Sequence, residues 1–308
     1  MARPESTELR VLLSTDLLSA GAGAHHAVAR LARSCPVQLT TVHVSADERW
    51  PAQRALEAFA ARGTHVSRCV LVRGHDAVGA VADLCNTERF DLVVAPASPR
   101  RGLPLPWASF RVQLLRRTSL PLWTGGSPAS PLSPERPVRT IACYVDFDDN
   151  PDGMLEAAAA FAGRVGARVG AVSVVPPLDD GTIADIATSM TPLTPGCASR
   201  RMYALASYYG VEDVAAAIGE RGPELQRLLR GMDADVLLVG RRQAAIGSLG
   251  FRLPRDLDRL PCPVLCIDAA ATRPAWWPRR PVDTATALTD FRSVTAAAMA
   301  RGTTVPAR

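Results

Sequence analysis

Short apolar runs alternate along the chain with Ala-rich segments whose apolar positions recur at helical spacing. One run covers residues 10–16 and another residues 139–146, and each ends in an Asp. Runs this short and this uniformly apolar are typical of strands buried on both faces of a parallel sheet. Each is followed by a segment with the pattern of an amphipathic helix, residues 24–35 and residues 151–165. The alternation predicts an α/β fold with helices on both faces of a parallel sheet.

The same order of elements occurs twice, which is the signature of an internal repeat. In the first half we expect strands at residues 10–16, 37–44, 67–72, 90–95 and 120–123, and in the second at residues 139–146, 168–175, 214–218, 234–240 and 262–267. A helix is expected before each fourth strand, at residues 77–87 and 224–231, with Asp76 and Glu224 near its positive end. The repeat therefore predicts two five-stranded parallel sheets.

The spacing between equivalent positions of the two halves is not constant. Asp16 and Asp146 lie 130 positions apart, whereas Gly74 and Gly222 lie 148 positions apart. The second half therefore has about 18 additional residues between its second and third strands. We interpret residues 179–210, which include a helical stretch near their end, as an insertion.

The repeat divides the chain into two tandem doubly wound domains and an extension. The first domain is expected at residues 8–124 and the second at residues 138–268. Residues 125–137 are rich in Pro and Ser, which is typical of a semi-rigid linker. The length of 308 residues fits two domains of about 130 residues better than one. Residues 269–308 form a basic C-terminal extension.

Composition and charge argue against several classes of function. All 35 basic residues are Arg, so the chain has no Lys for a Walker-type phosphate loop or for a Schiff base. The net charge is +5, but residues 269–308 supply +4 of it, so nucleic-acid binding is not expected. The sequence has no apolar run of 18 residues and no charged-then-apolar order at its N-terminus. We therefore expect neither a membrane span nor a signal peptide.

Seven cysteines are scattered along the chain without a CxxC pair. Those within apolar runs are Cys69, Cys143, Cys262 and Cys266. This distribution is typical of buried, reduced thiols in a cytoplasmic protein. His25 and His26, at the start of the first helix, have no further ligand at metal-binding spacing, so we expect them at the surface and expect no metal site.

The repeated pattern resembles the universal stress protein family. The resemblance rests on the Asp that ends each first strand, on a fourth strand that leads into a loop, and on a fifth strand that begins near Pro121 or Pro263. It implies an adenine nucleotide alpha hydrolase-like fold for about residues 8–124 and 138–268. Members of the family that bind ATP carry G-x-x-G, nine residues and then G-S or G-T after strand four. Glycines there let the main-chain N–H groups approach the phosphates.

Both copies of this loop depart from the family pattern. In the first half the spacing is kept, but Ala95 and Ser98 replace the first two glycines and only Ser109 remains at the end. In the second half Gly240 and Gly250 are kept, but the loop between them is three residues short. We therefore expect nucleotide binding to be weakened or lost, and any ATP to bind in the second half.

The candidate cofactor-binding residues are Asp16, Ser109, Asp146, Gly240, Arg241 and Gly250. The resemblance implies that the first-strand Asp lies near the nucleoside, whereas the residues alone favour an Asp that caps the turn after the strand. Arg241 and its neighbour Arg242, like Arg100 and Arg101 in the first half, either offset phosphate charge or form a solvated rim. The rim is the commoner arrangement.

The sequence contains no Ser-His-Asp set, carboxylate pair or poised general base, so an enzyme is not expected. It favours a non-catalytic regulatory or interaction protein with weakened or lost nucleotide binding. An ATP-binding regulator that uses the second half, and hydrolyses ATP slowly if at all, is the alternative. An α/β enzyme with another ligand at the strand ends is permitted by the fold class alone.

Two segments are candidates for contact with a protein partner. One is the insertion at residues 179–210, and the other is the C-terminal extension, where Trp276 and Trp277 either anchor a partner surface or fold back on the chain. The resemblance also implies that the two halves pack through their fifth strands as a pseudo-dimer. A homo-oligomer is a further option.

Overall fold

The computed structural model describes residues 8–17, 20–46, 49–61, 66–96, 110–124, 135–147, 150–175, 195–211, 213–244 and 260–268. Several expectations fall outside these ranges. They concern the linker at residues 125–134, most of the insertion at residues 176–194, the loops at residues 97–109 and 245–259, and the extension at residues 269–308.

The described residues form ten strands that alternate with helices. The first half contains β1 (Leu9–Ser14), α1 (Ala20–Ser34), β2 (Val37–Ser45), α2 (Arg49–Ala61), β3 (Val66–Arg73), α3 (Ala77–Thr87), β4 (Leu92–Ala95), α4 (Phe110–Arg117) and β5 (Leu122–Thr124). The second contains β6 (Thr140–Tyr144), α5 (Pro151–Val165), β7 (Arg168–Val175), α7 (Pro195–Tyr208), β8 (Asp213–Ile218), α8 (Arg221–Gly231), β9 (Val236–Gly240), α9 (Arg241–Ala244) and β10 (Val264–Ile267). All ten expected strands are confirmed, with shifts of a few residues at their ends.

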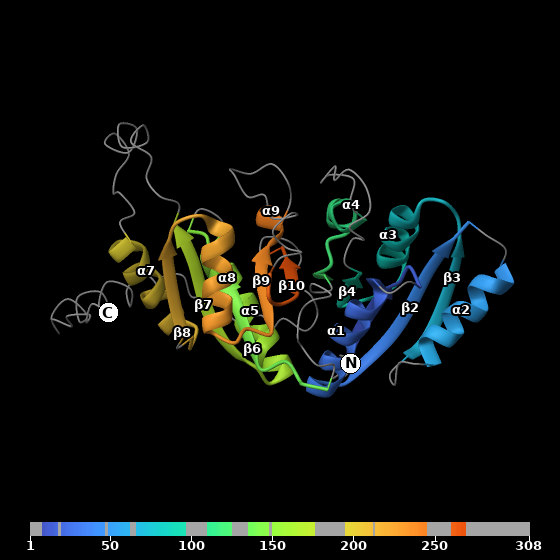
Figure 1. Cartoon of the computed structure of the whole chain (residues 1–308), viewed down its shortest axis with the longest axis horizontal. Coiled ribbons are helices and arrows are strands. Elements are labelled where there is room, and N and C mark those ends of the chain that lie inside the picture. Colours follow the sequence, from blue (N-terminus) through green and yellow to red (C-terminus); the bar gives the residue numbers. More distant parts are fainter. Residues whose placement is uncertain are drawn as a thin grey trace, which may run out of the picture.

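The strands form one sheet in the order β3-β2-β1-β4-β5-β10-β9-β6-β7-β8 (Figure 1). Within each half every pair is parallel and the first strand lies between the second and the fourth, as in a doubly wound fold. One face is covered by α1, α2, α5 and α7, and the other by α3, α4 and α8. The expected α/β class with helices on both faces is therefore confirmed.

Local capping explains why some helices begin and end where the sequence indicated. The side chain of Asn150 accepts a hydrogen bond from Gly153 N at the start of α5, Pro151 follows, and Gly166 ends the helix with φ of 67°. Asp76 caps α3 in the same way, accepting from Gly79 N at 2.8 Å. Both helices have the bounds that the sequence predicted.

The helix between the second and third strands corrects the predicted insertion. The first half contains α2 at this position, which was not predicted from the sequence, and the second half contains α7 at the same position. Helix α7 is therefore the counterpart of α2 and not an inserted element. The additional residues of the second half lie before α7, between β7 and the helix.

Two expectations about exposure are also corrected. His25 is half-buried, and its ring lies edge-on to that of Phe59 in α2, with 4.0 Å between the ring centroids. His26 is exposed as expected. Cys69 is only half-buried in β3, whereas the other three cysteines of apolar runs are fully buried. Burial raises the pKa of Cys262 and of Cys266 to about 12, so these thiols stay protonated at neutral pH.

The two halves are joined by a strand pair in the middle of the sheet. β5 and β10 run antiparallel, with Trp123 opposite Leu265. The hydroxyl of Thr124 donates to the carbonyl of Val264 at 3.3 Å. Trp123 is fully buried, and its ring lies 6.2 Å from that of Phe161 in α5. Each of the two buried apolar clusters contains residues of both halves, so the halves share their core.

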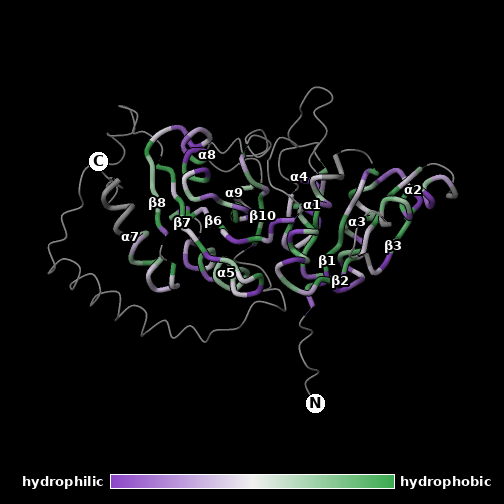
Figure 2. The backbone as a smooth tube through the Cα atoms, turned by 60° about the horizontal axis from the view of Figure 1, so that its bottom comes forward, coloured by the Kyte–Doolittle hydropathy of each residue, from purple (hydrophilic) through white to green (hydrophobic). Residues whose placement is uncertain are grey.

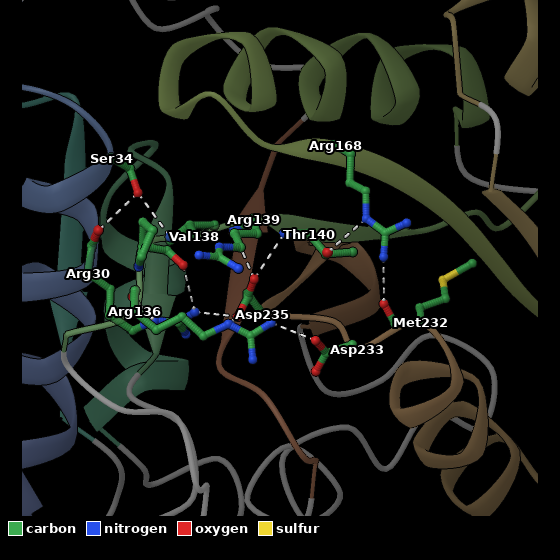
Figure 3. A network of polar contacts seen from close by, with 11 residues as sticks. Arg30, Ser34, Arg136, Val138, Arg139, Thr140, Arg168, Met232, Asp233 and Asp235 are labelled. Carbon is green, nitrogen blue, oxygen red and sulfur yellow. Dashed lines mark hydrogen bonds and ion pairs between the residues drawn. The ribbon is translucent and has the colours of Figure 1, made fainter.

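A buried ion pair crosses the same boundary at the amino ends of the strands (Figure 3). Nη2 of Arg30, in α1, donates to Oδ1 of Asp235, which lies just before β9. These side chains are 2% and 0% exposed. Nε of Arg30 also donates to the carbonyl of Arg136 at 2.8 Å. Oδ2 of Asp235 accepts from the main-chain N–H groups of Arg139 at 2.8 Å and Thr140 at 3.0 Å, so both charges are held by several hydrogen bonds.

Neighbouring contacts extend this network at the surface. The hydroxyl of Ser34 donates to the carbonyl of Arg30 at 3.0 Å and accepts from Val138 N at 2.9 Å. Arg136 pairs with the exposed Asp233 at 2.5 Å and lowers the pKa of that carboxyl. Helix α1 of the first half is thereby tied to the segment that enters β6.

We predict that Asp235→Asn lowers the free energy of unfolding by about 3–5 kcal/mol, because it leaves the buried guanidinium of Arg30 without its counter-charge. Urea unfolding of the full chain measures the loss. Asp233→Asn is the matched control, because it removes an exposed partner of Arg136 two positions away. Equal losses in the two variants would contradict the assignment of the buried pair as the principal contact.

Candidate functional site

Ligands of doubly wound folds bind at the carboxyl ends of the parallel strands. In the second half Asp146 follows β6 and Gly240 ends β9, and these two strands are neighbours. Their register places Asp146, Gly240 and the next residue, Arg241, at the same end of the sheet. Asp16 follows β1 at the corresponding place in the first half. Four of the six predicted site residues are therefore at the expected edge.

The remaining two predicted residues, Ser109 and Gly250, lie outside the described residues, as do Ser98, Arg100 and Arg101. Their roles stay predictions.

The end of β6 carries a buried Tyr that has no counterpart in β1. Tyr144 occupies the position of Ser14, and its hydroxyl donates to the carbonyl of Val174 at 3.5 Å. Burial raises the pKa of Tyr144 to about 12, the charge of Arg221 lowers it, and the charge of Asp146 raises it. Asp146 and Arg221 therefore both act on Tyr144, which places a carboxylate and a guanidinium at this edge.

The turn after β1 is capped by Thr15. Its hydroxyl accepts a hydrogen bond from Leu17 N at 3.0 Å, and its carbonyl lies 2.8 Å from Nδ1 of His43. Leu17 has a positive φ of 60°, which a side-chain cap of this kind supports. The capping function that the sequence suggested for Asp16 is thus performed at least in part by the preceding residue.

The side chain of Arg241 contacts the first half of the chain. Its guanidinium donates to three main-chain carbonyls at the end of α4 and the turn into β5, namely those of Leu115, Thr118 and, at 2.8 Å, Leu120. Nε lies 3.9 Å from Oδ2 of Asp268, and the side chain is only 14% exposed. Burial lowers the pKa of Arg241, while Asp268 raises it. The interpretation of Arg241 as part of a solvated rim is therefore wrong.

The chemistry of this contact follows from helix geometry. The last carbonyls of a helix have no partner within the helix and carry partial negative charge, so a guanidinium is a favourable cap. Arg241 provides this cap across the boundary between the halves. The charges of Arg241 and of the buried Arg111 in α4 both lower the pKa of Cys266 in β10, against the larger effect of burial. Two cations therefore line the boundary at this end of the sheet.

Sequence reasoning did not identify Arg30, Asp235, Tyr144 or Arg221. One signal was present: an Asp precedes the fourth strand in both halves, as Asp91 and as Asp235, inside an otherwise apolar stretch. A charged residue repeated at such a position indicates a partner elsewhere in the fold. Arg221 gave a second signal, because an Arg at a helix N-terminus opposes the helix dipole.

Among the residues that the structure describes, no group of three or more His, Cys, Asp or Glu side chains is placed to hold a metal ion. No helix in this part of the chain is both long and apolar enough to cross a membrane.

Comparison with known proteins gives one family match. Residues 137–268 match the model of the universal stress protein family. The search of curated protein sequences finds no relative of the chain.

Solved structures share the fold over nearly the whole chain. A putative universal stress protein from Pseudomonas aeruginosa UCBPP-PA14 is 17% identical with a TM-score of 0.52, over 94% of this chain and 98% of that one. A universal stress protein from Archaeoglobus fulgidus DSM 4304 is 15% identical with a TM-score of 0.57, and the match covers 84% of this chain and 96% of that one. The cytoplasmic domain of a prokaryotic cation chloride cotransporter is 9% identical with a TM-score of 0.50, and the match covers 87% of this chain and 98% of that one. The fold is adenine nucleotide alpha hydrolase-like.

We predict that Arg241→Gln lowers the free energy of unfolding by about 2–4 kcal/mol, because buried carbonyls lose a charged donor. Arg241→Lys keeps the positive charge but not the planar set of guanidinium donors, so its free energy of unfolding should fall by an intermediate amount. Arg230→Gln, on the exposed side of α8, is the control and should cost less than about 0.5 kcal/mol. Chemical denaturation measures all three, and an Arg241→Gln variant as stable as the control would refute the contact.

Proposed function

We propose that the chain is a non-catalytic regulatory or interaction protein of the universal stress protein type, in which nucleotide binding is weakened or lost. The family match of residues 137–268 supports a stress-response protein of this type. The observation that carries the proposal is the position of Arg241. It is the first residue after β9, where the phosphates of a nucleotide would lie, and its charge is directed to carbonyls of α4.

The loops support the same conclusion. The first half has no glycine at the three family positions, and Pro99, Pro104 and Pro106 remove main-chain donors from the segment. The second half keeps Gly240 and Gly250 but not the spacing between them. In both halves the N–H groups that would neutralise phosphate charge are therefore reduced in number or displaced.

The proposal includes the arrangement of the chain as two tandem domains, residues 8–124 and 138–268, that associate as a pseudo-dimer. The antiparallel pairing of β5 with β10 supports this arrangement, as does the repeated strand order. A cytoplasmic location is part of the same proposal, and its support is the set of buried thiols. A protein partner at Trp276 and Trp277 stays a prediction, since both lie outside the described residues.

An ATP-binding regulator is the second candidate, and one observation favours it. Asp146 and Gly240 lie at the same edge on adjacent strands, with Arg221 close enough to act on Tyr144. This combination offers a carboxylate for a ribose and a cation for a phosphate. It occurs in the second half, where the two glycines remain.

Isothermal titration calorimetry of the full chain with ATP distinguishes the two candidates. We expect no heat of binding, or binding only in the millimolar range, because Arg241, the first residue after β9, donates to carbonyls of the first half. Asp146→Asn tests the second half, and Asp16→Asn is its matched counterpart in the first. Micromolar binding that is lost in Asp146→Asn and in Gly240→Val but kept in Asp16→Asn would overturn the proposal in favour of the ATP-binding regulator.

A further inference from the structure

The ten-stranded sheet ends in β3 on one side and in β8 on the other (Figure 1). In the described part of the chain each of these strands has a single neighbouring strand, β2 and β7 respectively. The free side of an edge strand carries main-chain donors and acceptors that another strand can pair with. The two edges differ in how they are protected.

The hydrogen-bond pattern identifies the groups of β8 that face outward. Gly219 N donates to the carbonyl of Val175 at 3.1 Å, so this residue faces β7. Main-chain groups alternate in direction along a strand, and those of Val214, Ala216 and Ile218 therefore face away from β7. The hydroxyl of Tyr203, in α7, donates to the carbonyl of Val214 at 3.4 Å, which agrees with this direction.

Exposed apolar side chains gather at the same end of the molecule. The large hydrophobic residues that are exposed among those described are Tyr203 at 53%, Tyr208 at 56% and Ile218 at 51%. All three belong to α7 or to β8, and Figure 2 shows β8 coloured hydrophobic for most of its length. An apolar patch beside an unprotected edge is typical of an association surface.

The opposite edge has the features that prevent self-association. β3 contains Arg68 and Arg73, and Arg68 pairs with Glu88 at 2.8 Å. Its pairing with β2 is also irregular between Leu39 and Thr40. Charges and irregular pairing are common protections of edge strands. β8 has neither over Val214–Ile218, and its one charge, Asp213, is paired with Arg168 at 2.7 Å.

We propose that β8 pairs in antiparallel orientation with β8 of a second copy of the chain. A two-fold axis at Ala216 places Val214 of one copy opposite Ile218 of the other and yields about six main-chain hydrogen bonds, two of which share the Val214 carbonyl with the Tyr203 hydroxyl. Asp213 of each copy then lies opposite Gly219 of the other, beside its Glu220, and Arg168 offsets the negative charge at both ends of the pair. The chain already joins its own halves by an antiparallel edge pair, β5 with β10. The same geometry at β8 continues the sheet into a second copy and covers the three exposed apolar residues.

Sedimentation velocity over a range of concentrations tests the proposal on the full chain. We expect a monomer–dimer equilibrium that Ala216→Pro shifts to monomer, because proline removes an outward N–H without touching the β7 ladder. Ile218→Arg leaves the main-chain N–H groups intact and should also shift the equilibrium to monomer, because it places a charge between the two β8 strands. Hydrogen exchange of a peptide covering residues 213–219 should slow as the dimer forms.

Leu71→Pro is the matched control, because Gly74 N donates to Ser45 and the main chain of Leu71 in β3 therefore faces outward in the same way. It should leave the dimer intact, and circular dichroism checks that each variant is folded. A chain that is monomeric at every concentration overturns the proposal and leaves the edge to an extended segment of a different protein. A dimer that survives Ile218→Arg and is lost in Leu71→Pro also overturns it.

Discussion

The relative position of the two halves depends on the buried pair of Arg30 and Asp235. Removing two charges from water costs several kcal/mol for each ion, and attraction compensates only when the remaining hydrogen-bonding groups are also satisfied. Here the carboxylate accepts from the guanidinium and from the N–H groups of Arg139 and Thr140. The guanidinium also donates to the carbonyls of Arg136 and Pro137, while its buried Nη1 has no hydrogen-bond partner among the described residues. One pair thus fixes α1, the segment that enters β6 and the start of β9 in a single arrangement.

The contact across the boundary has a counterpart related by the repeat. Oδ2 of Asp91, before β4, accepts from Arg10 N at 2.9 Å, as Asp235 accepts from Thr140 in the second half. Burial raises the pKa of Asp91, and Arg164 of α5 lowers it. The charge of Arg164, in the second half, therefore influences the Asp of the first half, whereas Arg30 binds Asp235 directly. Charged groups of both halves therefore influence one another at the amino ends of the strands, on the same sheet as the β5–β10 pair.

Most elements with local signals could be predicted from the sequence, and elements without them could not. The bounds of α5 follow from Asn150, Pro151 and Gly166, which are adjacent to the helix they delimit. Helix α2 was missed although its buried residues, Ala52, Leu56 and Phe59, recur at helical spacing, so a local signal was present in the sequence. Helix α7 was identified as inserted, because a difference in spacing does not tell whether the added residues form the helix or the loop before it. The doubly wound class followed from the alternation of strands and helices, whereas the ion pair that joins the halves involves residues 205 positions apart.

The lack of a local signal also explains why the contact of Arg241 with the first half was not predicted from the sequence. Position 241 follows a kept glycine, so the sequence placed its guanidinium either at a phosphate or in solvent. The carbonyls that it caps lie more than 120 positions away, and nothing local indicates them. A single guanidinium cannot cap α4 and neutralise a phosphate at once. In the proposed function, a contact that helps to hold the second half against the first therefore removes one cation from the edge where a phosphate would lie.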